Sequence, residues 1–171
     1  IGEDKLGRNR VFFLPYLMGE RSPINDTNAR GTFTGMTMDT TREDMTLAVL
    51  EGVAFAIRDS FEVARSLGVE IPRSFICGGG SRSPLWRRIM ANVLGIPLDI
   101  PATEQGPGYG AAMLAMVACG GFGSVKEAAE ALVRVTDTVE PETELTARYA
   151  ERYARFAKIY PSCRGLFADL A

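Results

Sequence analysis

Residues 75–86 read FICGGGSRSPLW, in which a short apolar run meets three consecutive glycines and then a Ser-Pro pair. The apolar residues 75–77 predict a buried strand. Ser83 suits the N-cap of a helix and Pro84 its first position, so a helix should follow and stop at Gly95. The stretch therefore predicts a strand, a glycine turn and a helix in direct succession.

The triglycine Gly78, Gly79 and Gly80 fits two roles. A nucleotide phosphate or ribose approaches a backbone closely where side chains are missing, and the N–H groups at a helix N-terminus can donate to it. Glycines after a strand also serve ordinary tight turns, and the triglycine alone does not separate the two roles. The pattern G-x-x-x-x-G-K-[ST] is missing from the sequence, so a P-loop is excluded.

A dinucleotide-binding Rossmann module is an alternative reading of the same glycines. The pattern G-x-G-x-x-G would start at Gly78 and Gly80, but Ser83 stands where its third glycine belongs. In favour of this reading, Asp99 lies about twenty residues further on, where an acid that binds the ribose is expected.

Helix and strand patterns alternate on both sides of the glycines. Thr40 and Glu43 have capping-box spacing, and the helix behind them should end near Gly68. The further expectations, in chain order, are a strand at 98–100, a helix from Gly106 to near Gly120, a short helix from a Ser124–Glu127 capping box to about Val133, and a long helix carrying Leu145, Tyr149, Tyr153, Phe156 and Tyr160 that ends at Pro161. This α-β-α-β-α alternation predicts an α/β fold with parallel strands.

Size and composition favour one domain over residues 1–171, with a loop-rich segment at 1–40 and the α-β-α-β-α core with C-terminal helices at 41–171. The hydrophobic content of 46% is enough for a substantial core. The net charge of -2, with both signs interspersed, predicts neither nucleic acid nor a membrane as partner. The sequence contains no histidine, which excludes histidine chemistry within this chain.

Several single residues have a structural interpretation beside a functional one. The cysteines Cys77, Cys119 and Cys163 have no C-x-x-C spacing and apolar neighbours, which indicates reduced packing residues and a cytoplasmic protein. Trp86 is also expected to pack within the fold. The aromatic residues of the last helix are expected to pack in the core, with a homodimer contact as the alternative. Gly106, Gly108 and Gly110 are expected to allow close packing, with a position facing the nucleotide as the alternative. Arg87 and Arg88 should be solvated, with phosphate binding as the alternative. The segment Glu20-Arg21-Ser22-Pro23 fits an internally paired turn or an interdomain cleft.

Five blocks in this order carry a resemblance to a known family. They are FLPYLMGERSP at 13–23, ARGTFTGMT at 29–37, LEGVAFAIRD at 50–59, GGGSRSPLWRRIMANVLGIPL at 78–98 and GPGYGAAMLA at 106–115. Together they resemble the C-terminal domain of the carbohydrate kinases that include xylulokinase and glycerol kinase. The sequences GERSP and SPLWRR most resemble those of the xylulokinases. The resemblance spans most of the chain.

The resemblance implies an actin-like, ribonuclease H-like ATPase domain, the second of two, incomplete at its N-terminus. It implies ATP with Mg²⁺, a pentulose such as D-xylulose as substrate, and a nucleotide-binding set of Gly79, Gly80, Ser81 and the position of Pro84, with Gly78 and Arg82 beside it. Some relatives have Asn where this chain has Pro84, which puts adenine recognition there in doubt. The family's catalytic aspartate belongs to the sugar-binding half, so the resemblance implies no catalytic residue and no metal ligand in this chain, and an inactive fragment. A non-catalytic actin-like nucleotide-binding domain is a further alternative.

Overall fold

The structure is a computed structural model that describes residues 1–103 and 106–170. Its elements in chain order are a short 3-10 helix η1 (Glu3–Lys5), β1 (Phe12–Leu14), β2 (Thr32–Thr34), α1 (Arg42–Ser66), β3 (Ser74–Phe75), a 3-10 turn η2 (Gly79–Arg82), α2 (Pro84–Leu94), β4 (Leu98–Pro101), α3 (Gly106–Ala118), α4 (Val125–Leu132), β5 (Val135–Val139), α5 (Thr143–Phe156) and α6 (Ile159–Asp169).

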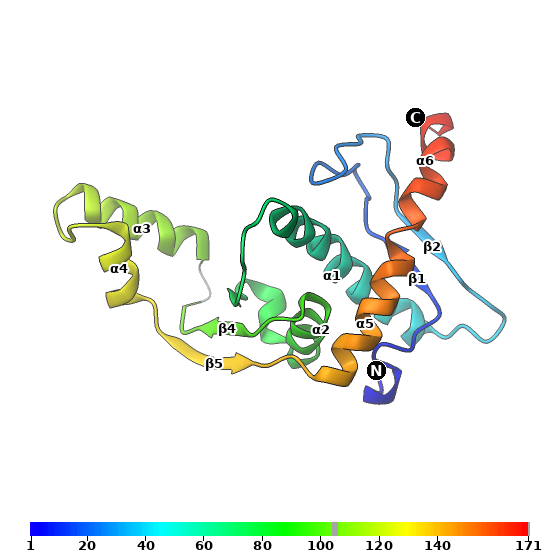
Figure 1. The fold of residues 1–171 in the computed structure, drawn as a ribbon, viewed down its shortest axis with the longest axis horizontal. Helices are drawn as coiled ribbons and strands as arrows, with labels where there is room; N and C mark the ends of the chain where they lie inside the picture. Colours follow the sequence, from blue (N-terminus) through cyan, green and yellow to red (C-terminus); the bar gives the residue numbers. More distant parts are fainter. Residues whose placement is uncertain (104–105, 171) are drawn as a thin grey trace.

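Helices α1, α2 and α5 form the middle of the molecule, with a small sheet on either side (Figure 1). Strands β1 and β2 pair antiparallel, and β1 runs along α1. The other sheet has the order β3-β4-β5, in which β3 is parallel to β4 and β5 is antiparallel to β4. Helices α3 and α4 pack mainly on each other at the end of the molecule opposite β1, β2 and α6 (Figure 1).

Helix α1 begins one residue later than the sequence pattern predicted. Thr41, and not Thr40, is the N-cap, and its hydroxyl accepts a hydrogen bond from the Asp44 backbone N–H at 3.2 Å. The Asp44 carboxylate in turn accepts from the Thr41 N–H at 2.9 Å. Asp44 thereby takes the role expected of Glu43, because a short carboxylate three residues after the cap closes the same reciprocal pair.

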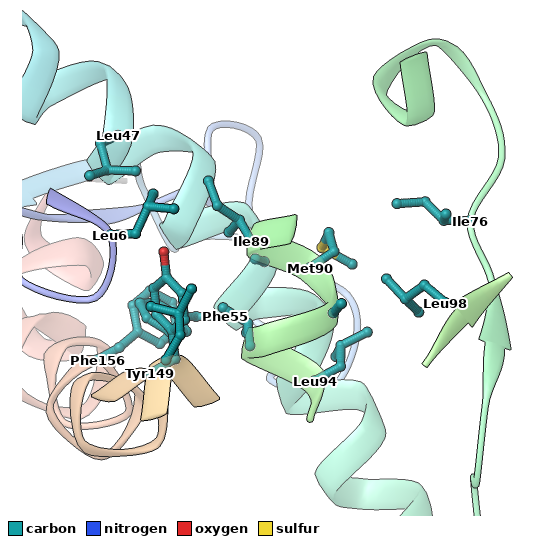
Figure 2. Packing of buried hydrophobic residues seen from close by; sticks show 14 of the residues in the cluster. Leu6, Leu47, Phe55, Ile76, Ile89, Met90, Leu94, Leu98, Tyr149 and Phe156 are labelled. Carbon is teal, nitrogen blue, oxygen red and sulfur yellow. The ribbon is translucent and has the colours of Figure 1, made fainter. Parts of the chain in front are cut away.

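Helix α2 lies between the aromatic core and the second sheet (Figure 2). Ile89 lies on the side of α2 that faces Leu6 and the aromatic rings, whereas Met90 lies on the side that faces Leu98 of β4. Phe55 is fully buried, and its ring centroid lies 5.2 Å from that of Phe156 on α5. The predicted packing of the aromatic row on the last helices is confirmed, since these rings close the core from the side of α5.

The prediction of parallel strands is confirmed for β3 and β4, but β5 was not expected. Strand β3 is also shorter than predicted and begins at Ser74, although the Ile76 N–H still donates to the Asp99 carbonyl at 3.0 Å. The strand is buried on one face only: Ile76 is 8% exposed and Phe75 is 54% exposed. Alternate side chains of a strand point to opposite faces, and only one face of this sheet packs on α2.

The long C-terminal helix predicted to end at Pro161 is two helices. Helix α5 ends at Phe156, and α6 begins at Ile159 with Pro161 in its first turn. An uninterrupted helix would need the Pro161 N–H to donate to the Ala157 carbonyl, and proline has no N–H. In the first turn of a new helix this N–H has no intrahelical partner, so proline is tolerated there.

Candidate functional site

The triglycine forms a tight turn between β3 and α2. Gly78 has φ of 86° and ψ of 178°, a backbone conformation that side chains disfavour, so its glycine is required by the turn itself. Ser81 closes the turn, because its N–H and its hydroxyl both donate to the Gly78 carbonyl, at 3.0 Å and 2.7 Å. The turn is therefore a rigid, hydrogen-bonded structure.

Gly80 and Gly79 differ in whether packing explains why the residue is a glycine. A Cβ on Gly80 would meet the indole of Trp86 at 3.1 Å, so packing within the chain accounts for this glycine. A Cβ on Gly79 would meet no described atom within 4 Å, and Gly79 has no positive φ. Packing and backbone conformation thus leave Gly79 unexplained, and free space over its backbone is what a closely approaching ligand would need.

Helix α2 starts directly behind this turn, as predicted. The Ser83 hydroxyl accepts from the Trp86 N–H at 3.2 Å, and Pro84 occupies the first helical position. The N-terminal end of α2 carries partial positive charge and is directed back toward the glycines. Pro84 is exposed, and the structure places it at the start of the helix with no N–H to offer a ligand.

A cavity of about 290 Å³ lies beside the glycine turn. It is bounded by the ends of β3 and β4, by the first turn of α2 and by β5, and its lining residues are Ile76, Cys77, Ser81, Arg82, Arg87, Ile100, Pro101, Ala102 and Thr136. Among the described residues, the Arg87 guanidinium has an Nε without a hydrogen-bond partner, and no lining residue is a carboxylate. The cavity is thus suited to a negatively charged group.

The structure brings some of the predicted site residues together and separates others. Ser81 and Arg82 line the cavity, while Gly78, Gly79 and Gly80 form the adjoining turn. Arg87, expected to be solvated with phosphate binding as the alternative, is only partly exposed and lines the cavity one helical turn behind the glycines.

Arg88 departs from its sequence-based expectation, whereas Trp86 agrees with its own. Arg88 is not simply solvated: its Nε lies 2.6 Å from Glu142 Oε1 and its Nη1 lies 3.0 Å from Glu3 Oε2. This pairing fixes α2 to the start of α5. Trp86 packs against the core, as predicted.

The cysteine and glycine packing predictions need correction. Cys77 and Cys119 are exposed, and Cys163 is partly buried against the core, with all three thiols free. Of the helix α3 glycines, Gly106 approaches Cys77, but a Cβ on Gly108 or Gly110 would meet nothing within 4 Å. These two glycines therefore do not serve packing in the described structure.

The Rossmann reading loses its acidic residue. Asp99 is 4% exposed and lies inside the sheet, where Oδ1 accepts from the Thr138 hydroxyl at 2.7 Å and Oδ2 lies 3.1 Å from Arg73 Nε. A carboxylate held in this way is not available to a ribose. The Glu20–Pro23 segment forms an internally paired turn, in which Glu20 and Asp26 exchange backbone hydrogen bonds of 2.9 Å and 2.8 Å.

A larger cavity, of about 380 Å³, lies between η1 and the start of α1. Its lining carries charges of both signs, from Asp4, Lys5, Arg8, Arg10, Asp39 and Asp44. Of these, Lys5 Nζ lies 3.1 Å from Asp44 Oδ1 and 3.3 Å from Glu43 Oε2. The Lys5 and Asp44 hydrogen bond holds the pKa of the lysine above its usual value. Positive and negative side chains are mixed in this lining, so the cavity favours neither an anion nor a cation, and the glycine turn is the better candidate.

In the ranges 1–103 and 106–170, no three His, Cys, Asp or Glu side chains converge on a position that could hold a metal ion. No helix within the same residues combines the length and apolar character needed to cross a bilayer.

Solved structures share this fold. The chain superposes on the ligand-bound xylulose kinase from Lactobacillus acidophilus with a TM-score of 0.86 and 27% identity, over 97% of this chain and 34% of that one. It superposes on the xylulose kinase from Rhodospirillum rubrum with a TM-score of 0.80 and 33% identity, over 95% of this chain and 32% of that one. The fold is therefore that of the sugar kinases, an actin-like ATPase fold, as the sequence resemblance implied.

Residues 3–119 match the FGGY family of carbohydrate kinases, C-terminal domain, and the chain belongs to this family. A curated relative, the xylulose kinase of Staphylococcus epidermidis, is 34% identical over 97% of this chain and 34% of its own length. The xylulose kinase of Escherichia coli is 35% identical over 92% of this chain and 33% of its own length. The chain thus spans about a third of the length of these relatives.

Proposed function

We propose that this chain is the ATP-binding part of a carbohydrate kinase that phosphorylates a sugar hydroxyl, with D-xylulose as the sugar. The observation that carries the proposal is the open backbone at Gly79, in a turn at the N-terminal end of α2, within a domain of the FGGY family. The xylulose kinase names of its relatives support the choice of sugar.

In this proposal the nucleotide lies against Gly78, Gly79, Gly80 and Ser81, with Arg82 beside it and Pro84 where some relatives have Asn. Backbone N–H groups and the positive end of α2 would hold its negative charge. Mg²⁺ would accompany the phosphates, since it prefers phosphate oxygens and water over a complete set of protein ligands. It would neutralise the phosphate charge during in-line transfer.

We assign no catalytic base within this chain. The base is an aspartate of the sugar-binding part of the kinase, and the 171-residue chain by itself transfers no phosphoryl group. A coupled ADP-release assay with D-xylulose checks this statement, and sugar phosphorylation by the purified chain would contradict it. We infer a cytoplasmic location for the full kinase, in keeping with the free thiols of this chain.

The proposal is tested by comparing the melting temperature of the chain with ADP–Mg²⁺ and with NAD. A ligand that binds the folded state raises the melting temperature by mass action. We expect a shift with ADP–Mg²⁺ and none with NAD. A shift with NAD alone would overturn the proposal, whereas ADP binding combined with an inactive full-length kinase would favour a non-catalytic nucleotide-binding domain.

A further inference from the structure

We propose that the cavity beside the glycine turn is a phosphoryl-group site in which the Arg87 guanidinium is the principal donor. The nucleotide as source of this group rests on the proposed function, but the anion-binding chemistry of the cavity does not. The proposal assigns to Arg87 the phosphate-binding role that the sequence left as the less favoured alternative.

The position of Arg87 directs its side chain to the turn. In a helix the Cα–Cβ bonds are tilted toward the N-terminus, so a long side chain covers the turn before its own residue. Arg87 lies in the first turn of α2, where its N–H donates to the Ser83 carbonyl at 3.0 Å. Its side chain thus reaches the cavity that Ser81 lines from the other side.

The guanidinium has an unmet hydrogen-bond donor. Arg87 Nε is buried from solvent and has no hydrogen-bond partner in the described structure. A buried donor without an acceptor is destabilising, and more so where the group is charged. Arg88, the next residue, differs from Arg87 in having two carboxylates as partners.

The surroundings favour an anion as the missing acceptor. The guanidinium of Arg87 lines the cavity, and the described lining residues include no carboxylate. The N-terminal end of α2 adds partial positive charge at the same place. A planar guanidinium offers two parallel N–H donors to phosphate oxygens, which makes a phosphoryl group the best-fitting ligand.

The test compares three probes on the 171-residue chain: ADP, adenosine and inorganic phosphate, each by isothermal titration calorimetry. Replacing Arg87 with methionine keeps the length of the side chain and removes its donors. We expect R87M to weaken ADP binding roughly ten- to hundredfold, the usual range for a charge-assisted hydrogen bond, and to leave adenosine binding unchanged. The matched control is Arg155→Met, which removes the same charge at an exposed position of α5.

The three probes distinguish a nucleotide from free phosphate as the source of the phosphoryl group. Loss of ADP affinity in R87M assigns the site to the nucleotide. If the chain binds neither ADP nor adenosine but binds inorganic phosphate in an Arg87-dependent way, the phosphoryl site stands and the proposed nucleotide function fails. Equal ADP and phosphate affinities in R87M and the parent chain would overturn the site, and so would a parent chain that binds neither probe.

A second measurement covers the case in which R87M does not fold. The Nε–Hε resonance of Arg87 in the unmodified chain should shift in ¹⁵N NMR when ADP or phosphate is added, because the buried Nε–H gains an acceptor. Arg87→Lys, which keeps the charge and loses the paired donors, should bind the successful probe more weakly than the parent chain. An unmoved resonance at saturating probe would contradict the proposal.

Discussion

Arg152 Nη2 of α5 lies 2.5 Å from Glu51 Oε2 of α1, and both side chains are almost completely buried. The same Arg152 nitrogen donates to the Val11 carbonyl at 3.3 Å. The other carboxylate oxygen of Glu51 has no hydrogen-bond partner in the described structure. Burial therefore outweighs the attraction to Arg152 and raises the pKa of the Glu51 carboxyl to about 7.

This raised pKa predicts a dependence of stability on pH. The folded chain binds the Glu51 proton more tightly than the unfolded chain, whose pKa is 4.5, so the contribution of Glu51 is greatest below about pH 4.5. It should decrease as the pH rises to about 7 and then level off. The decrease is roughly 3 kcal/mol at most, since a tenfold change in proton affinity is about 1.4 kcal/mol. Urea unfolding at pH 5 and pH 8 measures it.

Glu51→Gln isolates the effect, because glutamine does not titrate. The difference in unfolding free energy between the parent chain and E51Q should change between pH 5 and pH 8, with the parent chain losing relative stability. Glu151→Gln, on the exposed side of α5, is the control and should show no such change. A difference that is the same at both pH values would rule out Glu51 as the titrating group.

Gly79 and Gly80 should respond differently to substitution. Gly79→Ala places a methyl group in open space, so the fold should be unchanged while ADP affinity decreases about tenfold or more. Gly80→Val pushes against Trp86 and should lower the melting temperature as well as the ADP affinity. Melting curves without ligand and ADP titrations separate the two effects. Unchanged ADP binding in G79A would remove the glycine turn from the nucleotide site.

Asn92 is expected to be among the most sensitive polar residues of the fold. Its side chain is fully buried, and its Oδ1 accepts from the Glu142 N–H at 2.7 Å and from the Thr146 hydroxyl at 3.1 Å. Asn92 thus supplies from α2 the cap that Glu142, the N-cap residue of α5, does not supply itself. Asn92→Ala should cost about 2–3 kcal/mol of unfolding free energy, because it leaves buried donors without an acceptor.

Denaturant unfolding measures the cost at Asn92. Ser162→Ala provides a comparison, since its exposed hydroxyl donates only to the Lys158 carbonyl of its own helix and should cost less than 1 kcal/mol. A loss for N92A no larger than that for S162A would show that the α2–α5 contact does not depend on Asn92.

The sequence predicted helix ends well where the residues that determine them lie within one helical turn of the end. The Ser83–Pro84 start and the Gly95 end of α2 were correct, because a cap and a stop act on neighbouring residues. Strand β5 was missed because its sequence VTDTV has no apolar run, and it exists through hydrogen bonds to β4, far away in the chain. The helix boundary near Pro161 was predicted at the wrong place, because proline is compatible both with the end of one helix and with the first turn of the next.

The site was predictable in its backbone and less so in its side chains. Three glycines before a helix cap identify a turn from sequence alone. Arg87 belongs to the proposed site only because β4 and β5 help to enclose the cavity that it lines, and the pairing of these strands brings together residues 34 to 41 positions apart. Likewise, the exposure of Cys77 depends on which face of β3 meets α2, and apolar neighbours in the sequence do not determine this.

Helices α3 and α4 pack mainly against each other, and no residue of α3 is buried. Tyr109 of α3 is tied to the Leu132 carbonyl of α4 by a hydrogen bond of 2.8 Å. A pair with so few buried contacts to the rest of the molecule can open as a unit while the α1–α2–α5 core stays folded. Its backbone amides should therefore exchange with solvent long before those of the core, which makes this chain a protein with two separate thresholds of unfolding.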